Sequence, residues 1–202
     1  MLILEEKMKL RKVFNMTQIK STVFIATSLD GFISRGNGDI DWLMEANKCV
    51  PKGEDFGYKA FMDTVDTLVM GRNSYEVVLK FPEWPYKGKQ VVVMSRNHVD
   101  IPKHIQKLNV SCSSEHPEKL CKRLASNGAK QLYIDGGITI QRFLNAGQIK
   151  NIVITVIPIL LGKGNPLFGP TEKDIHLHHI NTTSYDFGFV QYKYEVKNLN
   201  LE

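Results

Sequence analysis

The chain has 202 residues, of which 43% are hydrophobic and 23% are charged. This composition is typical of a globular protein and excludes a disordered chain, a collagen-like fibre and a disulfide scaffold. The 26 Lys and Arg residues exceed the 21 Asp and Glu residues, which gives a formal charge of +5. So small a surplus suits the binding of an anionic ligand, whereas a dedicated nucleic-acid-binding protein would show clustered basic residues.

Residues 1–18 form a basic, methionine-rich segment, which we treat as an extension to one domain over residues 19–202. The segment lacks the apolar stretch of a signal peptide. The longest apolar run, 152–161, is shorter than the roughly 20 residues of a membrane span. The chain contains three cysteines and no CxxC motif: Cys49, Cys112 and Cys121. We therefore expect free thiols, no structural metal and a cytoplasmic location.

Segments rich in β-branched and aromatic residues predict a series of short strands. In chain order these strands span residues 21–28, 32–33, 67–70, 90–95, 107–113, 131–135 and 150–160. Helical patterns are found between them, at residues 54–63, 73–80, 117–126 and 138–145. Two more strands, with the alternating pattern of an exposed pair, are predicted near 175–185 and 188–196. This order predicts an α/β fold in which helices cover both faces of a mostly parallel sheet that has antiparallel strands at one edge.

Three junctions at the ends of predicted strands carry residues suited to phosphate binding. They are Gly71-Arg72-Asn73-Ser74, Ser95-Arg96 and Gly136-Gly137. Glycine lets a ligand approach the backbone, arginine supplies a fixed charge, and the first amides of a helix are unpaired donors. Ligands in open α/β sheets gather at the carboxyl ends of the strands, so the junctions together predict a site for several phosphates. Plain tight turns are the alternative, and the GxGxxG motif of the standard dinucleotide fold is absent.

Asp55 is the candidate general acid, because it opens the predicted helix 54–63 shortly after Trp42. A carboxyl group beside aromatic side chains such as Phe56 and Tyr58 would have a raised pKa. The alternative is a carboxylate placed at a helix start, where it interacts with the helix dipole.

Two other polar features have simpler interpretations. His176 and His178 would share one face of a strand, but no third metal ligand accompanies them, so an exposed edge strand is the better interpretation. Asp30 is most simply a turn residue before Gly31.

Five segments, taken in order, resemble the dihydrofolate-reductase-like superfamily: VFIATSLDGFIS, TLVMGRNSYEVV, VVVMSR, LYIDGGITIQRFLNAG and ITVIPILLGKGNPLF. Within this superfamily the chain most resembles the reductase domain of bacterial riboflavin biosynthesis (the RibD C-terminal domain) and its stand-alone relatives, and the resemblance covers residues 20–196. It implies a three-layer α/β/α fold with a mixed, mainly parallel central sheet. It also implies a homodimer and an oxidoreductase that uses NADPH to transfer a hydride to a C=N or C=O bond of a pterin-like or pyrimidine-like molecule.

The resemblance also implies roles for individual residues. Those toward the cofactor are Ala26 and Ile33 at the nicotinamide, Gly71, Arg72, Asn73 and Ser74 at the phosphates, Ser95 and Arg96 at the adenosine 2′-phosphate, and Gly136, Gly137 and Ile138 at the pyrophosphate. The loop 32–42 corresponds to a mobile lid over the nicotinamide. Trp42 at the end of this loop, and Asp55 sixteen residues before Gly71, are assigned to the substrate pocket.

Two departures from these relatives concern the substrate. Trp42 follows Asp41, where dihydrofolate reductases carry a Pro-Trp pair in the lid, and the HxE…PCxxC signature of a fused zinc deaminase is absent. A non-catalytic nucleotide-binding or regulatory module on the same fold is the alternative function.

Overall fold

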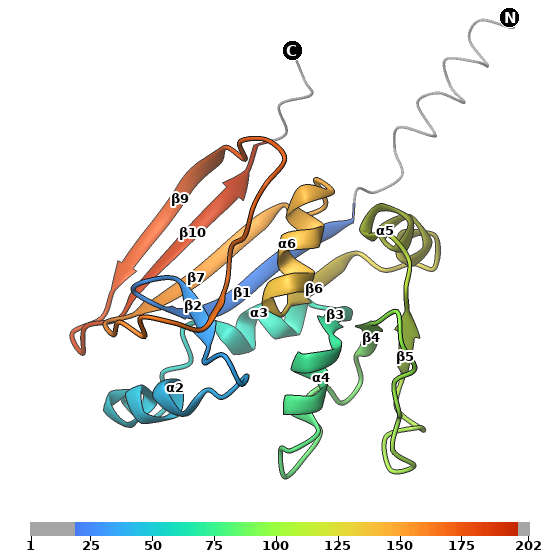
Figure 1. Ribbon diagram of the computed structural model, residues 1–202, viewed down its shortest axis with the longest axis horizontal. Coiled ribbons are helices and arrows are strands. Elements are labelled where there is room, and N and C mark those ends of the chain that lie inside the picture. Colours follow the sequence, from blue (N-terminus) through green and yellow to red (C-terminus); the bar gives the residue numbers. More distant parts are fainter. Residues whose placement is uncertain (1–18, 198–202) are drawn as a thin grey trace, which may run out of the picture.

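An eight-stranded sheet runs through residues 19–197, the part of the chain that the computed structural model describes (Figure 1). Its strand order is β5-β4-β3-β6-β1-β7-β10-β9. The parallel strands are β1 (Lys20–Ser28), β3 (Thr67–Gly71), β4 (Gln90–Met94), β5 (Val110–Ser113), β6 (Gln131–Asp135) and β7 (Asn151–Ile157). Strand β10 (Val190–Val196) pairs antiparallel with both β7 and β9 (Leu177–Ser184). The predicted sheet, with antiparallel strands at one edge, is confirmed.

Helices cover both faces of this sheet, which confirms the three-layer α/β/α arrangement. On one face, α5 (Pro117–Ser126) and α6 (Gly137–Asn145) pack on a core that includes Val69 and Ile134. On the other face, α3 (Tyr58–Thr64) and α4 (Arg72–Val78) pack on a core that includes Leu68 and Met70. Consecutive residues of β3 therefore face opposite cores, and its central residues 68–70 are apolar because both faces of the strand are buried.

A third, smaller apolar cluster lies beside the antiparallel edge. It joins Trp42 of α2 (Asp41–Ala46) to Ile157 at the end of β7 and to Phe189, which precedes β10. The sequence did not predict α2, the 3-10 turn η1 (Asn47–Cys49) that follows it, or a two-stranded ribbon. This ribbon pairs β2 (Phe32–Ser34) with β8 (Asn165–Pro166). Strand β2 lies within the predicted lid, α2 begins at the end of the lid and extends past it, and η1 follows α2. Strand β8 lies in the loop after β7.

Several predicted boundaries shift for local reasons. Helix α3 begins at Tyr58 and not at residue 54, because Phe56 and Gly57 have φ values of +59° and +80°. Strand β7 ends at Ile157 because Pro158 has no amide hydrogen with which to continue the ladder. Helix α4 begins earlier than predicted, directly after Gly71. The predicted N-terminal extension, residues 1–18, lies outside the described residues.

Candidate cofactor and substrate site

The three predicted phosphate-binding junctions end adjacent strands, because β4, β3 and β6 are neighbours in the sheet. Their carboxyl ends share one edge, and β4 and β6 lie about 10 Å apart across β3. The structure therefore brings the three junctions together.

Glycine lets the ends of β3 and β6 pack closely. A Cβ atom on Gly136 would lie 2.5 Å from Ser74 Oγ, and one on Gly71 would lie 2.9 Å from Thr139 Oγ1. Gly136 also has a φ of +86°, a conformation that L side chains rarely adopt. Packing within the protein thus accounts for both glycines and places Ser74 beside the glycine pair.

The lid reaches the same glycine pair from the other side. A Cβ atom on Gly137 would lie 3.2 Å from Ile33 Cδ1 and 2.8 Å from the backbone oxygen of Pro166. Ile138 follows in the first turn of α6 and is 72% exposed. An exposed apolar side chain next to the free amides of a helix start suits contact with a ligand that carries both a ring and a phosphate.

Asp135, which ends β6 just before the glycine pair, is a carboxylate to which the sequence assigned no chemistry. Burial raises the pKa of Asp135, and hydrogen bonds from the Ser74 hydroxyl and the Gly136 backbone only partly oppose that shift. Burial, with a contribution from the Asp135 charge, also raises the pKa of Tyr58 to about 12. The sequence feature that could have pointed to Asp135 is its position at a strand end, directly before a glycine pair.

Ser74 and Arg72 are both engaged within the protein. Ser74 was expected at the phosphates, but it lies inside α4, and that helix begins without a side-chain capping hydrogen bond. Its hydroxyl donates to Asp135 instead. Arg72 Nε lies 2.6 Å from Glu76 Oε1, while Asn73 is exposed. An anion at Arg72 would therefore share that guanidinium with Glu76.

Ser95 and Arg96 differ in whether their side chains are already bound within the protein. Ser95 Oγ accepts from the Asn97 amide (3.1 Å) and donates to the Asn97 carbonyl (2.9 Å), so this side chain closes the turn after β4. Arg96 is exposed and forms no ion pair within residues 19–197. Its charge is available to an anion from solvent.

Asp55 has the geometry of a helix-capping residue. The amides of Gly57 and Lys59 each donate to its carboxylate at 2.9 Å, and the side chain is exposed. These hydrogen bonds lower the pKa of Asp55, so the expected upward shift is wrong in direction. The contacts match the alternative interpretation, a carboxylate at a helix start.

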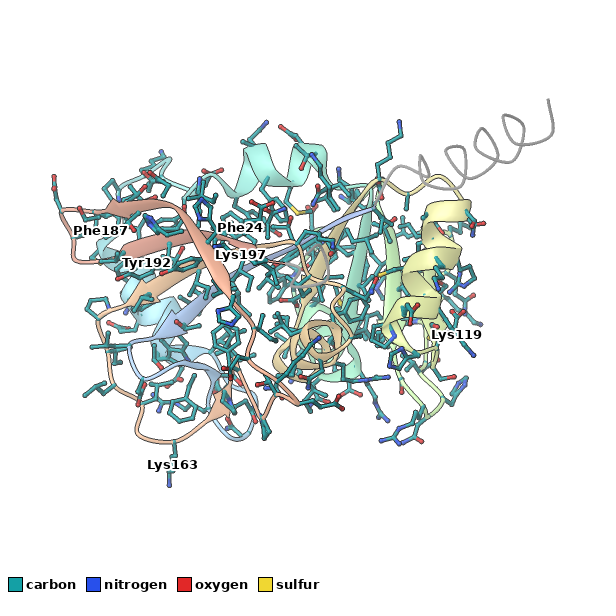
Figure 2. The ribbon with its side chains drawn as sticks, turned by 90° about the horizontal axis from the view of Figure 1, so that it is seen from above. Phe24, Lys119, Lys163, Phe187, Tyr192 and Lys197 are labelled. Atoms are coloured by element: carbon teal, nitrogen blue, oxygen red, sulfur yellow. The ribbon has the colours of Figure 1, made fainter. Side chains whose placement is uncertain are left out.

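Trp42 lines an open pocket of about 530 Å³ between α2, the end of β7 and the β9–β10 hairpin. The lining residues are Arg35, Asp41, Trp42, Glu45, Ala46, Cys49, Ile157, Pro158, Ile159, Phe187 and Phe189. Figure 2 shows Phe187 at the far end of that hairpin. Ala26 packs against the Trp42 cluster, whereas Ile33 packs against the core beneath α6. The two residues expected at the nicotinamide therefore belong to different apolar clusters.

Asp30 fixes the base of the lid. Its carboxylate accepts hydrogen bonds from the Ser28 hydroxyl (2.6 Å) and from the amides of Leu161 (3.1 Å) and Gly162 (2.7 Å). Further along, the Asn165 side chain donates to Ser34 Oγ at 2.9 Å. Asp30 is thus a turn residue, as expected, and it also ties the lid to the loop after β7.

Of the predicted histidine pair, His178 lies on exposed strand β9, whereas His176 precedes that strand. The neighbouring His179 contacts Thr182 Oγ1 at 2.7 Å. No group of three or more potential metal ligands gathers among residues 19–197. No helix in this described part of the chain is long and apolar enough to cross a membrane.

Comparison with known proteins identifies relatives over nearly the whole chain. Residues 20–190 match the family model of the RibD C-terminal domain. The uncharacterized protein YwjB of Bacillus subtilis (strain 168) is 37% identical over 82% of this chain and 92% of its own length. A crystal structure of a putative riboflavin biosynthesis protein from Shewanella sp. PV-4 is 39% identical, with a TM-score of 0.82 over 89% of this chain and 100% of that one.

Two more distant structures share the fold. One is a diaminohydroxyphosphoribosylaminopyrimidine deaminase/5-amino-6-(5-phosphoribosylamino)uracil reductase from Thermotoga maritima, 15% identical, with a TM-score of 0.67 over 89% of this chain and 57% of that one. The other is dihydrofolate reductase from Enterococcus faecalis complexed with NADP(H), 16% identical, with a TM-score of 0.59 over 90% of this chain and 98% of that one. The dihydrofolate-reductase-like fold implied by the sequence is confirmed.

Proposed function

Because this chain belongs to the RibD C-terminal domain family, we propose that it is an NADPH-dependent reductase that acts on a C=N or C=O bond of a pterin-like or pyrimidine-like molecule. One observation carries the proposal. The phosphate-suited junctions end adjacent strands, and a partly buried carboxyl group, Asp135, lies beside them with a raised pKa. Perturbed carboxyl groups of this kind are typical of active sites.

The residues at the strand ends fit a phosphate-rich dinucleotide. The first amides of α6, after Gly136 and Gly137, would hold the pyrophosphate, and the exposed Arg96 would hold the 2′-phosphate. Ile33 and Ile138 would contact the rings. When bound, NADPH supplies the hydride, and the dihydrofolate reductase structure with NADP(H) supports this choice of cofactor.

Asp135 would be the general acid that donates the proton to the substrate. A carboxyl group with a raised pKa keeps its proton to higher pH than an ordinary aspartic acid, so it can donate that proton to the nitrogen or oxygen next to the reduced carbon. Ser74 and the Gly136 amide would act as positioning groups, because both donate hydrogen bonds to this carboxylate. We assign the proton to Asp135 and not to Asp55, whose carboxylate caps α3.

The test combines NADPH titration with two matched substitutions. We expect NADPH to stabilise the protein against heat, and a screen of pterins, pyrimidines and small carbonyl compounds to reveal NADPH oxidation. Asp135→Asn should lower turnover by about 10²–10⁴-fold while NADPH affinity stays the same. Asp55→Asn, the control, should leave turnover nearly unchanged.

The reaction rate should depend on pH in one direction. The protonated form of Asp135 is the active one, so the wild-type rate should fall as pH rises through the raised pKa. Absence of NADPH binding would refute the cofactor assignment. An unchanged rate in Asp135→Asn would remove Asp135 from the mechanism, and NADPH binding without oxidation across the panel would favour the non-catalytic module.

We also propose a cytoplasmic homodimer that pairs through β9. This strand lies at the open edge of the sheet and exposes Leu177 and Ile180 by 40% and 55%. Sedimentation should give a dimer for the wild type and a monomer for Ile180→Lys. Leu160→Lys, an exposed residue outside β9, is the control and should stay dimeric.

A further inference from the structure

The pocket beside Trp42 has an aromatic and aliphatic interior. Trp42 and Phe189 are 3% and 2% exposed, so the core holds both side chains in place. Phe187 packs edge-on against Phe189, with ring centroids 5.0 Å apart. Ile157 and Pro158 line the wall formed by the end of β7. Such a lining suits a flat, apolar ring system, and the volume of about 530 Å³ is that of an ordinary small-molecule pocket.

The charges of the pocket oppose an anion. Its lining contains one cation, Arg35, and two carboxylates, Asp41 and Glu45. Arg35 Nε lies 2.6 Å from Asp41 Oδ1, so that guanidinium is already paired. A phosphate in this pocket would meet a paired arginine and a second carboxylate, and two negative groups brought close together repel each other.

One wall also contains an unused hydrogen-bond donor. Trp42 Nε1 is buried and has no hydrogen-bond partner among residues 19–197. A buried polar group without a partner is uncommon in native proteins, and a ring carbonyl or ring nitrogen of a ligand would satisfy it. The nitrogen is covered in this structure, so a ligand atom would reach it only where the atoms that cover it move apart.

We propose that the substrate which enters this pocket is an uncharged planar heteroaromatic molecule without a phosphate group. This inference rests on the proposed reductase function and narrows its substrate class. Asp135 is not among the residues that line the pocket, so the substrate would extend from the pocket toward the end of β6 to take up the proton. It separates the chain from the Thermotoga maritima enzyme, whose name specifies a phosphoribosylamino substrate.

Riboflavin and flavin mononucleotide provide a direct test, because they share one pyrimidine-containing ring system and differ by a phosphate. Binding is measured by quenching of flavin fluorescence, with saturating NADP⁺ present to keep flavin out of the cofactor site. We expect riboflavin to bind at least tenfold more tightly than flavin mononucleotide. Trp42→Phe should weaken the quenching, whereas Trp84→Phe, which changes the other tryptophan, should not, because Trp84 lies outside the pocket lining.

A charge reversal makes the test sharper. Glu45→Lys should raise the affinity for flavin mononucleotide relative to riboflavin by at least tenfold. The control Glu118→Lys reverses an exposed charge on α5 and should leave that ratio unchanged. Equal affinity of the wild type for both flavins would overturn the proposal, as would failure of either flavin to bind while NADP⁺ still stabilises the protein. Failure of NADP⁺ binding would instead refute the proposed reductase function.

Discussion

The two halves of the candidate site are built differently. The cofactor side consists of regular strand ends, at β3, β4 and β6, and close contacts at Gly71 and Gly136 join the ends of β3 and β6. The pocket side consists of short or irregular segments far apart in the sequence, namely α2, the end of β7 and the β9–β10 hairpin (Figure 1). The contrast indicates that the first half tolerates little change in shape, whereas the second is free to vary with the substrate.

Gly136→Ala would destabilise the cofactor side of the site more than any other substitution considered. The new Cβ atom would meet Ser74 Oγ at 2.5 Å, and the residue would keep a φ of +86°. We expect a loss of roughly 3 kcal/mol in the free energy of unfolding, measured by urea denaturation. Gly88→Ala is the control, because Gly88 has a similar φ of +79° and no atom within 4 Å of the added Cβ. Equal losses in both variants would show that the packing at Gly136 is not tight.

Arg96→Ala would test whether the unpaired guanidinium at the end of β4 binds the 2′-phosphate of NADPH. We expect NADPH affinity to fall about 10–100-fold, because a hydrogen bond to a charged group contributes about 1.5–3 kcal/mol. NADH affinity, measured by the same titration, should not change, because NADH lacks the 2′-phosphate. Arg123→Ala, on α5 and paired with Glu115, is the control. A parallel loss of NADPH and NADH affinity would contradict the assignment of Arg96.

Asp55→Ala would give the smallest effect and would separate capping from chemistry. Removal of the carboxylate leaves the Gly57 and Lys59 amides without their acceptor, so we expect a small drop in thermal stability. The folded state lowers the pKa of Asp55, so the wild-type advantage is present at neutral pH. It should disappear as pH falls through that lowered pKa. A melting-temperature series against pH checks this, with Asp63→Ala on the same helix as the control.

The sequence was informative where hydrophobic patterning decides structure. The buried strands and the helices that end at Ser126 and Asn145 follow from apolar runs, glycine and proline, so the sheet and its phosphate-suited edge were predictable. Tertiary contacts decide the rest. Helix α2 is held by Trp42 against β7, and the β2–β8 ribbon joins segments that are about 130 residues apart. No local pattern specifies either.

The two candidate carboxylates show the same limit. Asp55 precedes a helix and stands among aromatic residues in the sequence, yet the backbone turn at Phe56 and Gly57 places it at the surface. Asp135 was predicted only as the last residue of a strand, but α4 supplies its hydrogen-bond donor from Ser74. Burial depends on what packs around a group, and the chain order alone does not reveal those neighbours.

The contacts of Asp30 have a consequence for exchange with solvent. Because Asp30 holds Leu161 and Gly162, and Asn165 holds Ser34, two loops distant in the sequence share their hydrogen bonds. Neither loop can open without loosening the other. We therefore expect the amides near 30–35 and 161–167 to exchange with deuterium as one cooperative unit. The two loops would then open together, and one opening rate would control the entry of a ligand to the site.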